Sequence, residues 1–170
     1  MSEPRQSMDE AVAQDTGAGA FQARIHTAGV EILADEPVSA GGLGSGPTPY
    51  QLLASALASC TTMTLRLYAT HKGWPVRSIS TAVGHSRDEG ATPADRFTRR
   101  IEVDGDLDAE QHARLIEMAD RCPVHRTLAA GARIETLADG TPPPAQHATD
   151  HAVDMEALIA VGRGSYDFVG

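Results

Sequence analysis

The sequence predicts an α+β fold in which a long central helix lies beneath antiparallel sheet. Stretches in which apolar and polar residues alternate, as in half-buried strands, occur at 21–35, 76–87 and 97–103. One continuous helical run extends from 49 to 72, and its first sixteen or so residues carry no Asp, Glu, Lys or Arg. Because this helix itself carries small uncharged side chains on almost every side, we expect other parts of the protein to enclose its first turns.

The N-terminal half is expected to begin with a disordered leader. Residues 1–19 are small, polar and acidic with no hydrophobic period. A domain at 20–138 then opens with two short strands within 21–35, joined by a turn at 27–29. Residues 139–170 begin with the Pro-rich stretch TPPPAQHATDH, so we expect a linker and a C-terminal tail, in which 153–159 form a short docking helix.

A glycine-rich loop leads into the long helix. Residues 38–48 contain four glycines and a proline, and no P-loop lysine follows, so the loop does not match a phosphate cradle. Thr48 is the expected N-cap, Pro49 occupies the first turn, and Gly73 ends the helix. Its predicted apolar face consists of Leu53, Ala56, Leu57, Cys60, Met63, Thr64, Leu67 and His71.

The C-terminal half alternates between strands and helices. After the strands at 76–87 and 97–103, Asp108 and Gln111 form an Asp-x-x-Gln capping box that starts another helix. Pro123 disfavours the α conformation at the preceding residue and suits the first helical position, so Cys122 is the expected N-cap of the next turn. A further strand is expected at 132–137.

The composition excludes several function classes. The 170 residues carry a formal net charge of −9 with 4% aromatic residues and no Lys/Arg-rich block, so neither nucleic acid nor an anionic membrane is an expected partner. No apolar run is long enough for a transmembrane helix, and no signal peptide is readable. We therefore expect a cytoplasmic protein, in which two cysteines form a transient redox pair more readily than a structural disulfide.

The two cysteines have different local settings. Cys60 lies mid-helix on the predicted apolar face, where a free cysteine commonly fills space. Cys122, at an expected helix N-terminus, would have the amides of Val124 and His125 directed at its sulfur. With His125 or Arg126 beside it, the pKa of the Cys122 thiol would fall. The alternative is that Cys122 is only a small N-cap residue and that His125 and Arg126 are solvated.

Other candidate residues are less specific. Glu36, with its neighbour Asp35, either orients an arginine or contributes surface charge to the loop. Cys60, Cys122 and His125 lack a fourth ligand at metal-site spacing, so neither a metal nor a cofactor is expected.

Two segments resemble the OsmC/Ohr family of thiol-dependent peroxidases. Ala34–Pro75 contains a glycine-rich loop, a proline and a helix with a central cysteine, and Leu115–Leu128 contains Cys-Pro-Val-His-Arg-Thr-Leu. With the intervening strands, the resemblance covers about 21–137. It implies an intertwined homodimer whose two long helices are enclosed by two sheets, with both active sites at the interface.

The resemblance also implies a chemistry. Cys60 would attack a hydroperoxide, Cys122 would resolve the sulfenic acid as a disulfide, and an external thiol would reduce it. Related proteins carry a Glu in the turn that opens the helix, where this chain has Tyr50 followed by Gln51. That Glu holds an arginine over the attacking sulfur, and the possible substitutes here are Arg24, Arg99 and Arg126. The alternative function is a non-catalytic small-molecule-binding or redox-sensing protein of the same fold.

Overall fold

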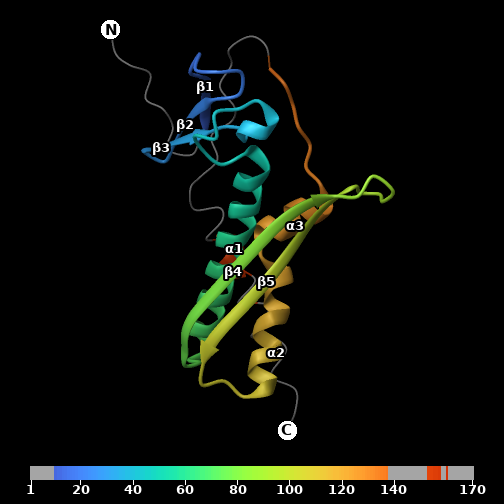
Figure 1. The fold of residues 1–170 in the computed structure, drawn as a ribbon. Helices are drawn as coiled ribbons and strands as arrows, with labels where there is room; N and C mark the ends of the chain where they lie inside the picture. Colours follow the sequence, from blue (N-terminus) through green and yellow to red (C-terminus); the bar gives the residue numbers. More distant parts are fainter. Residues whose placement is uncertain (1–9, 138–152, 158–159, 161–170) are drawn as a thin grey trace. The chain divides into compact units, whose positions relative to one another are not determined.

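The computed structural model describes residues 10–137, 153–157 and 160 (Figure 1). These residues divide into two compact units. One unit holds the described residues up to Leu52 together with 135–137, and the other holds Leu53–Ile134 with 153–157 and 160. The predicted class is confirmed, since a long helix and two antiparallel sheets make up the structure.

The first unit contains a three-stranded antiparallel sheet. Strands β1 (Val12–Asp15), β2 (Ala23–Thr27) and β3 (Val30–Ala34) pair in the order β1-β2-β3, which confirms the predicted hairpin. The structure differs from the predicted leader at β1, whose side chains are mostly exposed. The pairing of β1 with β2 requires only main-chain hydrogen bonds, so the sequence of β1 has no hydrophobic pattern from which the strand could be predicted. Residues 1–9 lie outside the described residues.

A buried aspartate organises the glycine-rich loop of this unit. The Asp35 carboxylate accepts hydrogen bonds from the amides of Glu36 (2.8 Å), Leu43 (3.1 Å) and Ser45 (3.2 Å), and from the Ser45 hydroxyl (2.7 Å). The Ser45 hydroxyl in particular lowers the pKa of Asp35. No other residue type fits in place of Gly42 in this loop, because a Cβ there would overlap the carbonyl oxygen of Glu36. A short 3₁₀ turn, η1 (Val38–Ala40), completes the loop.

Helix α1 (Pro49–Lys72) begins and ends at the predicted residues. The Gln51 amide donates to Thr48 Oγ1 (3.2 Å) and the Thr48 amide donates to Gln51 Oε1 (2.9 Å), which is a reciprocal cap. Gly73 follows with φ +66°, the left-handed conformation usual after a helix.

The buried face of α1 differs from the predicted one. Leu53 and Met63, which lie on the predicted apolar face, are 43% and 55% exposed in the single chain. In a helix that is uncharged nearly all round, period alone does not decide which side packs inward. The residues that are buried are Ala54, Leu57, Cys60, Thr61, Thr64, Leu65, Tyr68 and Ala69.

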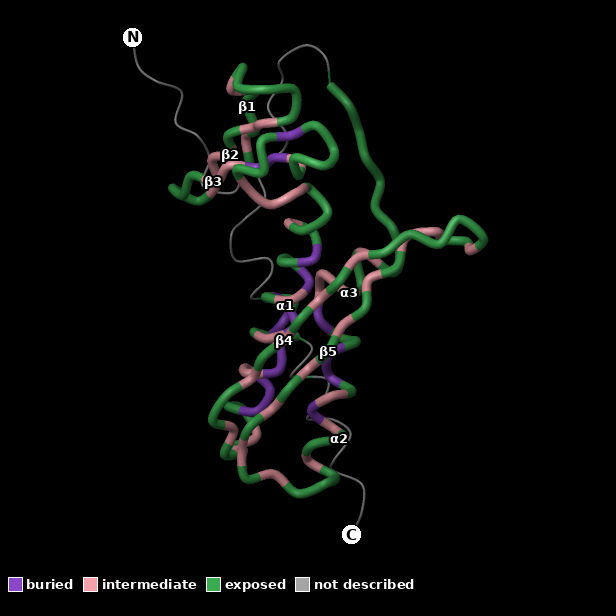
Figure 2. The backbone as a smooth tube through the Cα atoms, in the orientation of Figure 1, coloured by how far each residue is buried: buried purple, intermediate pink, exposed green. Residues whose placement is uncertain are grey.

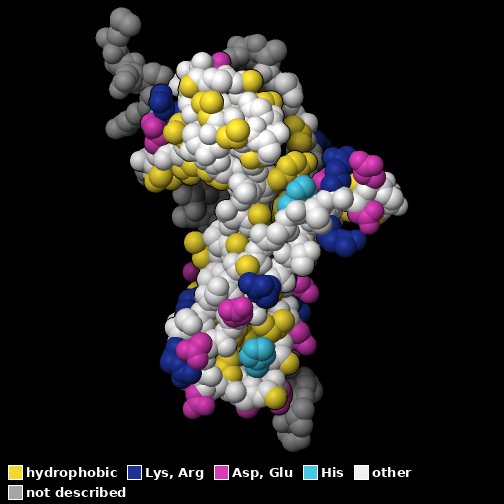
Figure 3. Space-filling view, viewed as in Figure 1, with side chains coloured by type: hydrophobic (Ala, Val, Ile, Leu, Met, Phe, Trp, Pro, Cys, Tyr) yellow, Lys and Arg dark blue, Asp and Glu magenta, His cyan; other side chains and the backbone are white. Residues whose placement is uncertain are grey.

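A long hairpin covers α1 in the second unit (Figure 2). Strands β4 (Val76–Arg87) and β5 (Asp95–Gly105) pair antiparallel, and a register shift between Val76 and Ser78 turns Val76 to the same face as Ile79. That inner face packs against a buried cluster from α1 and the helix after β5, namely Leu65, Tyr68, Ala69, Leu115, Met118 and Ala119. Charged side chains lie on the outer face (Figure 3).

The remaining elements follow the hairpin. Helix α2 (Ala109–Met118) starts with the predicted Asp108–Gln111 capping box, a 3₁₀ turn η2 (Ala119–Arg121) follows, and α3 (Pro123–Ala130) starts at Cys122 as predicted. The strand expected at 132–137 is wrong, because this exposed stretch adopts no regular structure and pairs with no described strand. Residues 153–157 are helical as expected, whereas 158–159 lie outside the described residues.

Candidate active site at the cysteine pair

The second unit brings the two cysteines together. Cys60 lies mid-helix in α1, and Cys122 is the N-cap of α3 with extended backbone angles (φ −60°, ψ 137°). Both are free thiols, and their residues are only 3% and 0% exposed. They form one buried cluster with Leu57, and the apolar residues packed against it are Val83, Phe97, Val124 and Leu128.

The first turn of α3 supplies hydrogen bonds to both sulfurs. The His125 amide donates to Cys122 Sγ (3.3 Å), as expected for an N-cap. The Val124 amide donates instead to Cys60 Sγ (3.5 Å), so the prediction that both amides point at Cys122 was wrong for Val124. One helix N-terminus, with its partial positive charge, therefore faces the whole pair.

Arg99 is the cation beside the pair. It occupies an inward-facing position of β5, and its side chain is 13% exposed. Its Nη1 donates to Thr61 Oγ1 (3.0 Å) and to the Ala119 carbonyl (2.9 Å), while Nη2 pairs with Asp120 Oδ1 (2.7 Å). The guanidinium thus links α1 to the turn that leads into Cys122.

Thr61 fills the space between Arg99 and Cys122. Its hydroxyl donates to the Leu57 carbonyl at 2.7 Å and also lies 3.8 Å from Cys122 Sγ. The Thr61 hydroxyl has a single proton for these two acceptors. The Leu57 carbonyl is much closer, so it receives the stronger hydrogen bond. We therefore assign Thr61 mainly the task of holding the guanidinium near the sulfur.

These contacts separate the acidities of the two thiols. The hydrogen bond from the Cys60 thiol, the His125 amide, the Thr61 hydroxyl and the Arg99 charge outweigh burial and lower the pKa of Cys122 to about 5. The same Cys60–Cys122 hydrogen bond, together with burial, raises the pKa of Cys60 far above its ordinary value. Because the two thiols share a hydrogen bond, their ionisation is coupled and the pair loses its first proton as a unit.

The other candidate residues are placed less centrally. The His125 ring lies at the edge of the site, with Nδ1 3.9 Å from Asp120 Oδ1, and Arg126 is exposed. Glu36 and Gln51 belong to the first unit, where the Glu36 backbone contributes to the loop and Gln51 caps α1. Arg24 also lies in that unit and pairs with Glu31 (3.2 Å).

Sequence reasoning named Arg99 only as one of three possible cations and missed Thr61. The available signal was an arginine between Phe97 and Ile101 on the inward-facing side of an alternating strand. A buried arginine requires a polar partner, so this position indicated a polar contact inside the unit. No comparable signal marks Thr61, which resembles the other small residues of α1.

An apolar cavity adjoins the cysteine cluster. It has a volume of about 210 Å³ and shares Leu57, Phe97 and Leu128 with the residues that surround the sulfurs; its full lining is Leu57, Pro93, Asp95, Phe97, His125, Leu128 and Ala129. A mostly apolar lining with a few polar groups is typical of sites for small organic molecules.

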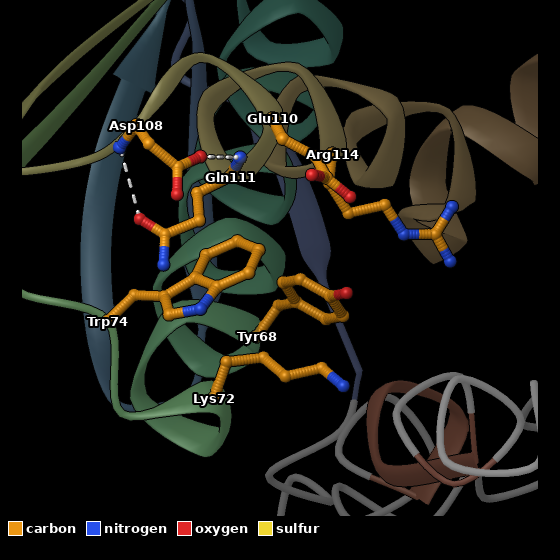
Figure 4. Close-up of a pocket in the computed structure, with 7 residues that line it drawn as sticks. All are labelled: Tyr68, Lys72, Trp74, Asp108, Glu110, Gln111 and Arg114. Atoms are coloured by element: carbon orange, nitrogen blue, oxygen red, sulfur yellow. Dashed lines mark hydrogen bonds between the residues drawn. The ribbon is translucent and has the colours of Figure 1, made fainter. Parts of the chain in front are cut away.

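A second cavity of about 220 Å³ has a different character (Figure 4). Trp74 and Tyr68 meet edge to face at 5.5 Å, and Lys72 Nζ lies 5.7 Å from the centre of the Tyr68 ring. The Asp108–Gln111 capping box forms another wall, and neither cysteine contributes to the lining. The cavity thus lies between the end of α1 and the start of α2.

Within the described residues, no group of three or more His, Cys, Asp and Glu side chains is arranged to hold a metal ion, so the Cys60–Cys122–His125 combination does not form such a group. None of the described helices is long and apolar enough to cross a membrane.

Comparisons with known proteins agree on one family. The model of the OsmC-like protein family matches residues 42–137, whereas no curated protein matches the chain. An osmotic stress induced and detoxification response protein from Psychrobacter arcticus 273-4 is 22% identical, with a TM-score of 0.59 over 74% of this chain and 91% of its own.

Two other solved structures are similar. An OsmC-like protein from Mycoplasma pneumoniae is 21% identical, with a TM-score of 0.59 over 75% of this chain and 89% of its own. An organic hydroperoxide resistance protein OsmC from Legionella pneumophila is 19% identical, with a TM-score of 0.55 over 70% and 87%. At these identities the likeness establishes a shared fold.

Proposed function

Because this chain belongs to the OsmC-like family, we propose that it is a thiol-dependent peroxidase that reduces organic hydroperoxides through Cys60 and Cys122. The observation that carries the proposal is the contact between the two thiols, one of which has a pKa lowered to about 5. A thiolate next to a protonated thiol is the arrangement that two-cysteine peroxide reduction requires.

The chemistry balances with no cofactor. One thiolate sulfur bonds to a peroxide oxygen, the O–O bond breaks, and the organic fragment leaves as an alkoxide that takes up a proton. The second sulfur then displaces hydroxide from the sulfenic acid, which leaves a Cys60–Cys122 disulfide. An external thiol reductant returns both cysteines to the reduced state, as a cytoplasmic setting would permit.

The cavity beside the pair supports an organic substrate. Leu57, Phe97 and Leu128 offer apolar contact to a hydrocarbon group, whereas hydrogen peroxide would gain nothing from them. Structural relatives from Legionella pneumophila and Elizabethkingia anophelis are described as organic hydroperoxide resistance proteins, which agrees with this substrate class.

The test is stoichiometric oxidation of the reduced full-length chain with cumene hydroperoxide, followed by peptide mass spectrometry. We expect a Cys60–Cys122 disulfide and one equivalent of cumyl alcohol. Exposed Ser78 gives a matched control, because Ser78→Ala should oxidise as the native protein does, whereas Cys60→Ser and Cys122→Ser should form no internal disulfide. An intact dithiol after exposure to cumene hydroperoxide would contradict the proposal.

A redox-sensing or ligand-binding role is the second candidate, and the burial of both sulfurs favours it. Turnover separates the two functions. A peroxidase consumes many equivalents of hydroperoxide when dithiothreitol or dihydrolipoamide is supplied, whereas a sensor is oxidised once and a simple binder is not oxidised.

We also propose that the protein forms a homodimer through α1. Leu53 and Met63 are exposed on the part of α1 that lies in the second unit, and Ala56 between them is exposed as well. These residues recur at helical spacing and form an uncharged stripe on one face. An identical stripe on a second copy is a matching partner, because a two-fold axis brings the same surface of both chains together.

A further inference from the structure

We infer that the cavity between the end of α1 and the start of α2 is a second binding site, which takes a small organic monocarboxylate with a flat apolar body. This site is separate from the cysteine chemistry, because neither cysteine lines it. All of its lining residues belong to the second unit. Trp74 forms one side of the site, and the donor atoms of Tyr68, Lys72 and Arg114 lie toward the other (Figure 4).

Arg114 brings a buried donor without an acceptor to this cavity. Its Nη1 pairs with Glu117 Oε2 at 2.8 Å, whereas the buried Nε has no hydrogen-bond partner among the described residues. A buried polar group that lacks a partner is rare in folded proteins because it is costly. A carboxylate suits this position, since its oxygens match the planar guanidinium group.

Two further donors lie near this guanidinium. The Glu117 carboxylate and then the Tyr68 hydroxyl raise the pKa of Arg114, which indicates that the Tyr68 oxygen faces the guanidinium as an acceptor. A hydroxyl that accepts through its oxygen keeps its proton for another acceptor. Lys72 Nζ lies 5.7 Å from the centre of the same tyrosine ring. An anionic ligand group would therefore meet two cations and one hydroxyl.

Trp74 supplies the apolar wall. Its indole ring meets the Tyr68 ring edge to face with 5.5 Å between the ring centres, so the two rings form an aromatic corner. The cavity has a volume of about 220 Å³. A cavity of about 150 Å³ is enough for one benzene ring, so the remaining volume fits a carboxylate but not a long chain. An aryl carboxylate about the size of benzoate therefore suits the site.

Asp108 and Glu110 limit the charge of the ligand. The Asp108 carboxylate accepts the Gln111 amide at 2.7 Å, and exposed Glu110 is screened by water. Because these two carboxylates balance Lys72 and Arg114 on the lining, a monoanion is better matched than a dianion. An organic cation would compete for the aromatic corner, but Lys72 already lies over the Tyr68 ring.

The test uses the fluorescence of Trp74, which is the only tryptophan of the chain. The reduced full-length protein is titrated at neutral pH with benzoate, with the neutral benzamide, with benzylammonium and with phenyl phosphate. We expect benzoate to give a saturable change in emission with a Kd of about 1 mM or tighter. Each of the other three compounds should bind at least about fivefold more weakly, because each lacks the matching single negative charge.

Three variants assign the effect to Arg114. Arg114→Met removes the unpartnered donor and the charge, so it should weaken benzoate binding at least about tenfold. Glu117→Gln removes the ion pair but keeps the guanidinium, so it should bind benzoate at least as tightly as the native protein does. A merely structural role of the Arg114–Glu117 pair would weaken binding in both variants. Arg100→Met, on the exposed face of β5, should bind as the native protein does.

The ligand series on the native protein decides the inference even without substitutions. Tighter binding of benzylammonium or phenyl phosphate than of benzoate would overturn the ligand class, and equal affinities for benzoate and benzamide would show that the donors do not recognise the carboxylate. The absence of a saturable change up to about 10 mM benzoate would exclude the site. If circular dichroism shows that Arg114→Met is unfolded, Lys72→Met takes its place with a smaller expected loss. None of these results bears on the peroxidase proposal.

Discussion

Arg99 shows how a single charged side chain contributes to the acidity of the site. Its guanidinium lies on the Cys122 side of the pair and lowers the pKa of that thiol. We predict that Arg99→Met raises the midpoint of the Cys122 alkylation profile, which should lie near pH 5 in the native protein, by a fraction of a pH unit, because the hydrogen bonds to Cys122 contribute more than the Arg99 charge. The measurement is the rate of iodoacetamide labelling of Cys122 against pH.

Two further variants separate a charge effect from a structural one. Arg99→Lys retains the positive charge, so it should recover part of the shift, whereas a purely structural defect would not respond to charge. Arg100→Met removes an arginine from the exposed face of the same strand and should leave the midpoint unchanged. An unchanged midpoint in Arg99→Met would show that Arg99 does not act on the thiolate.

Asp35 gives the glycine-rich loop its dependence on pH. Its pKa is lower in the folded chain than in the unfolded one, so its stabilising contribution is full above an unfolded value of about 3.9 and is lost as pH falls through the folded value. We predict that Asp35→Ala speeds hydrogen exchange at the Leu43 and Ser45 amides at neutral pH. Glu89→Ala, at an exposed loop residue, is the control.

The same loop should respond to acid in the native protein. Exchange at the Leu43 and Ser45 amides, corrected for the intrinsic effect of pH, is expected to rise below about pH 4 because the protonated carboxyl binds its donors less strongly. If the Leu43 and Ser45 amides are protected equally at pH 3 and pH 7 within experimental error, the assigned role of Asp35 is contradicted.

At the scale of elements, the start of α2 depends on its capping box. Asp108 Oδ1 accepts the Gln111 amide at 2.7 Å, and Gln111 returns a hydrogen bond to the Asp108 amide at 3.1 Å. We predict that Asp108→Ala lowers the free energy of unfolding by about 1 kcal/mol, measured by urea denaturation. Exposed Asp106 lies two residues earlier, and Asp106→Ala should change the free energy of unfolding by less.

The elements that the sequence predicts well are those with local signals. Thr48 with Pro49, Asp108 with Gln111, and Pro123 after Cys122 mark three helix starts, and the structure has all three. Strand β1 is present although no strand was predicted there, whereas the strand predicted at 132–137 is not found. Whether a strand exists depends on a partner elsewhere in the chain, and the local pattern does not report that partner.

The site shows the same limit. That Cys122 caps a helix follows from its neighbour Pro123, but the direction of the Val124 amide depends on Cys60, which lies 64 positions before Val124. The Arg99–Thr61 contact likewise joins β5 to α1 across 38 positions. Such contacts arise from packing, so the sequence can nominate an inward-facing arginine but not its target.

At the scale of the whole molecule, the exposed stripe on α1 is the feature on which the proposed homodimer rests. Enclosure of this helix by protein was expected from its uncharged sequence, yet Leu53 and Met63 are exposed in the single chain. Exposed apolar residues that recur on one helix face are a common mark of an interface. A second copy would supply the missing cover and make the predicted enclosure complete.

The assembly prediction is tested at Met63, which is 55% exposed at one end of the stripe. We expect the native chain to sediment as a dimer and Met63→Glu to sediment as a monomer, because each chain would bury a carboxylate in the interface without a partner. Thr98→Glu places the same charge on the exposed face of β5 and should remain dimeric. Circular dichroism of the variants checks that the helix is retained. A native chain that stays monomeric at high micromolar concentration would rule out the α1 interface, and an unchanged dimer in Met63→Glu would place the interface elsewhere.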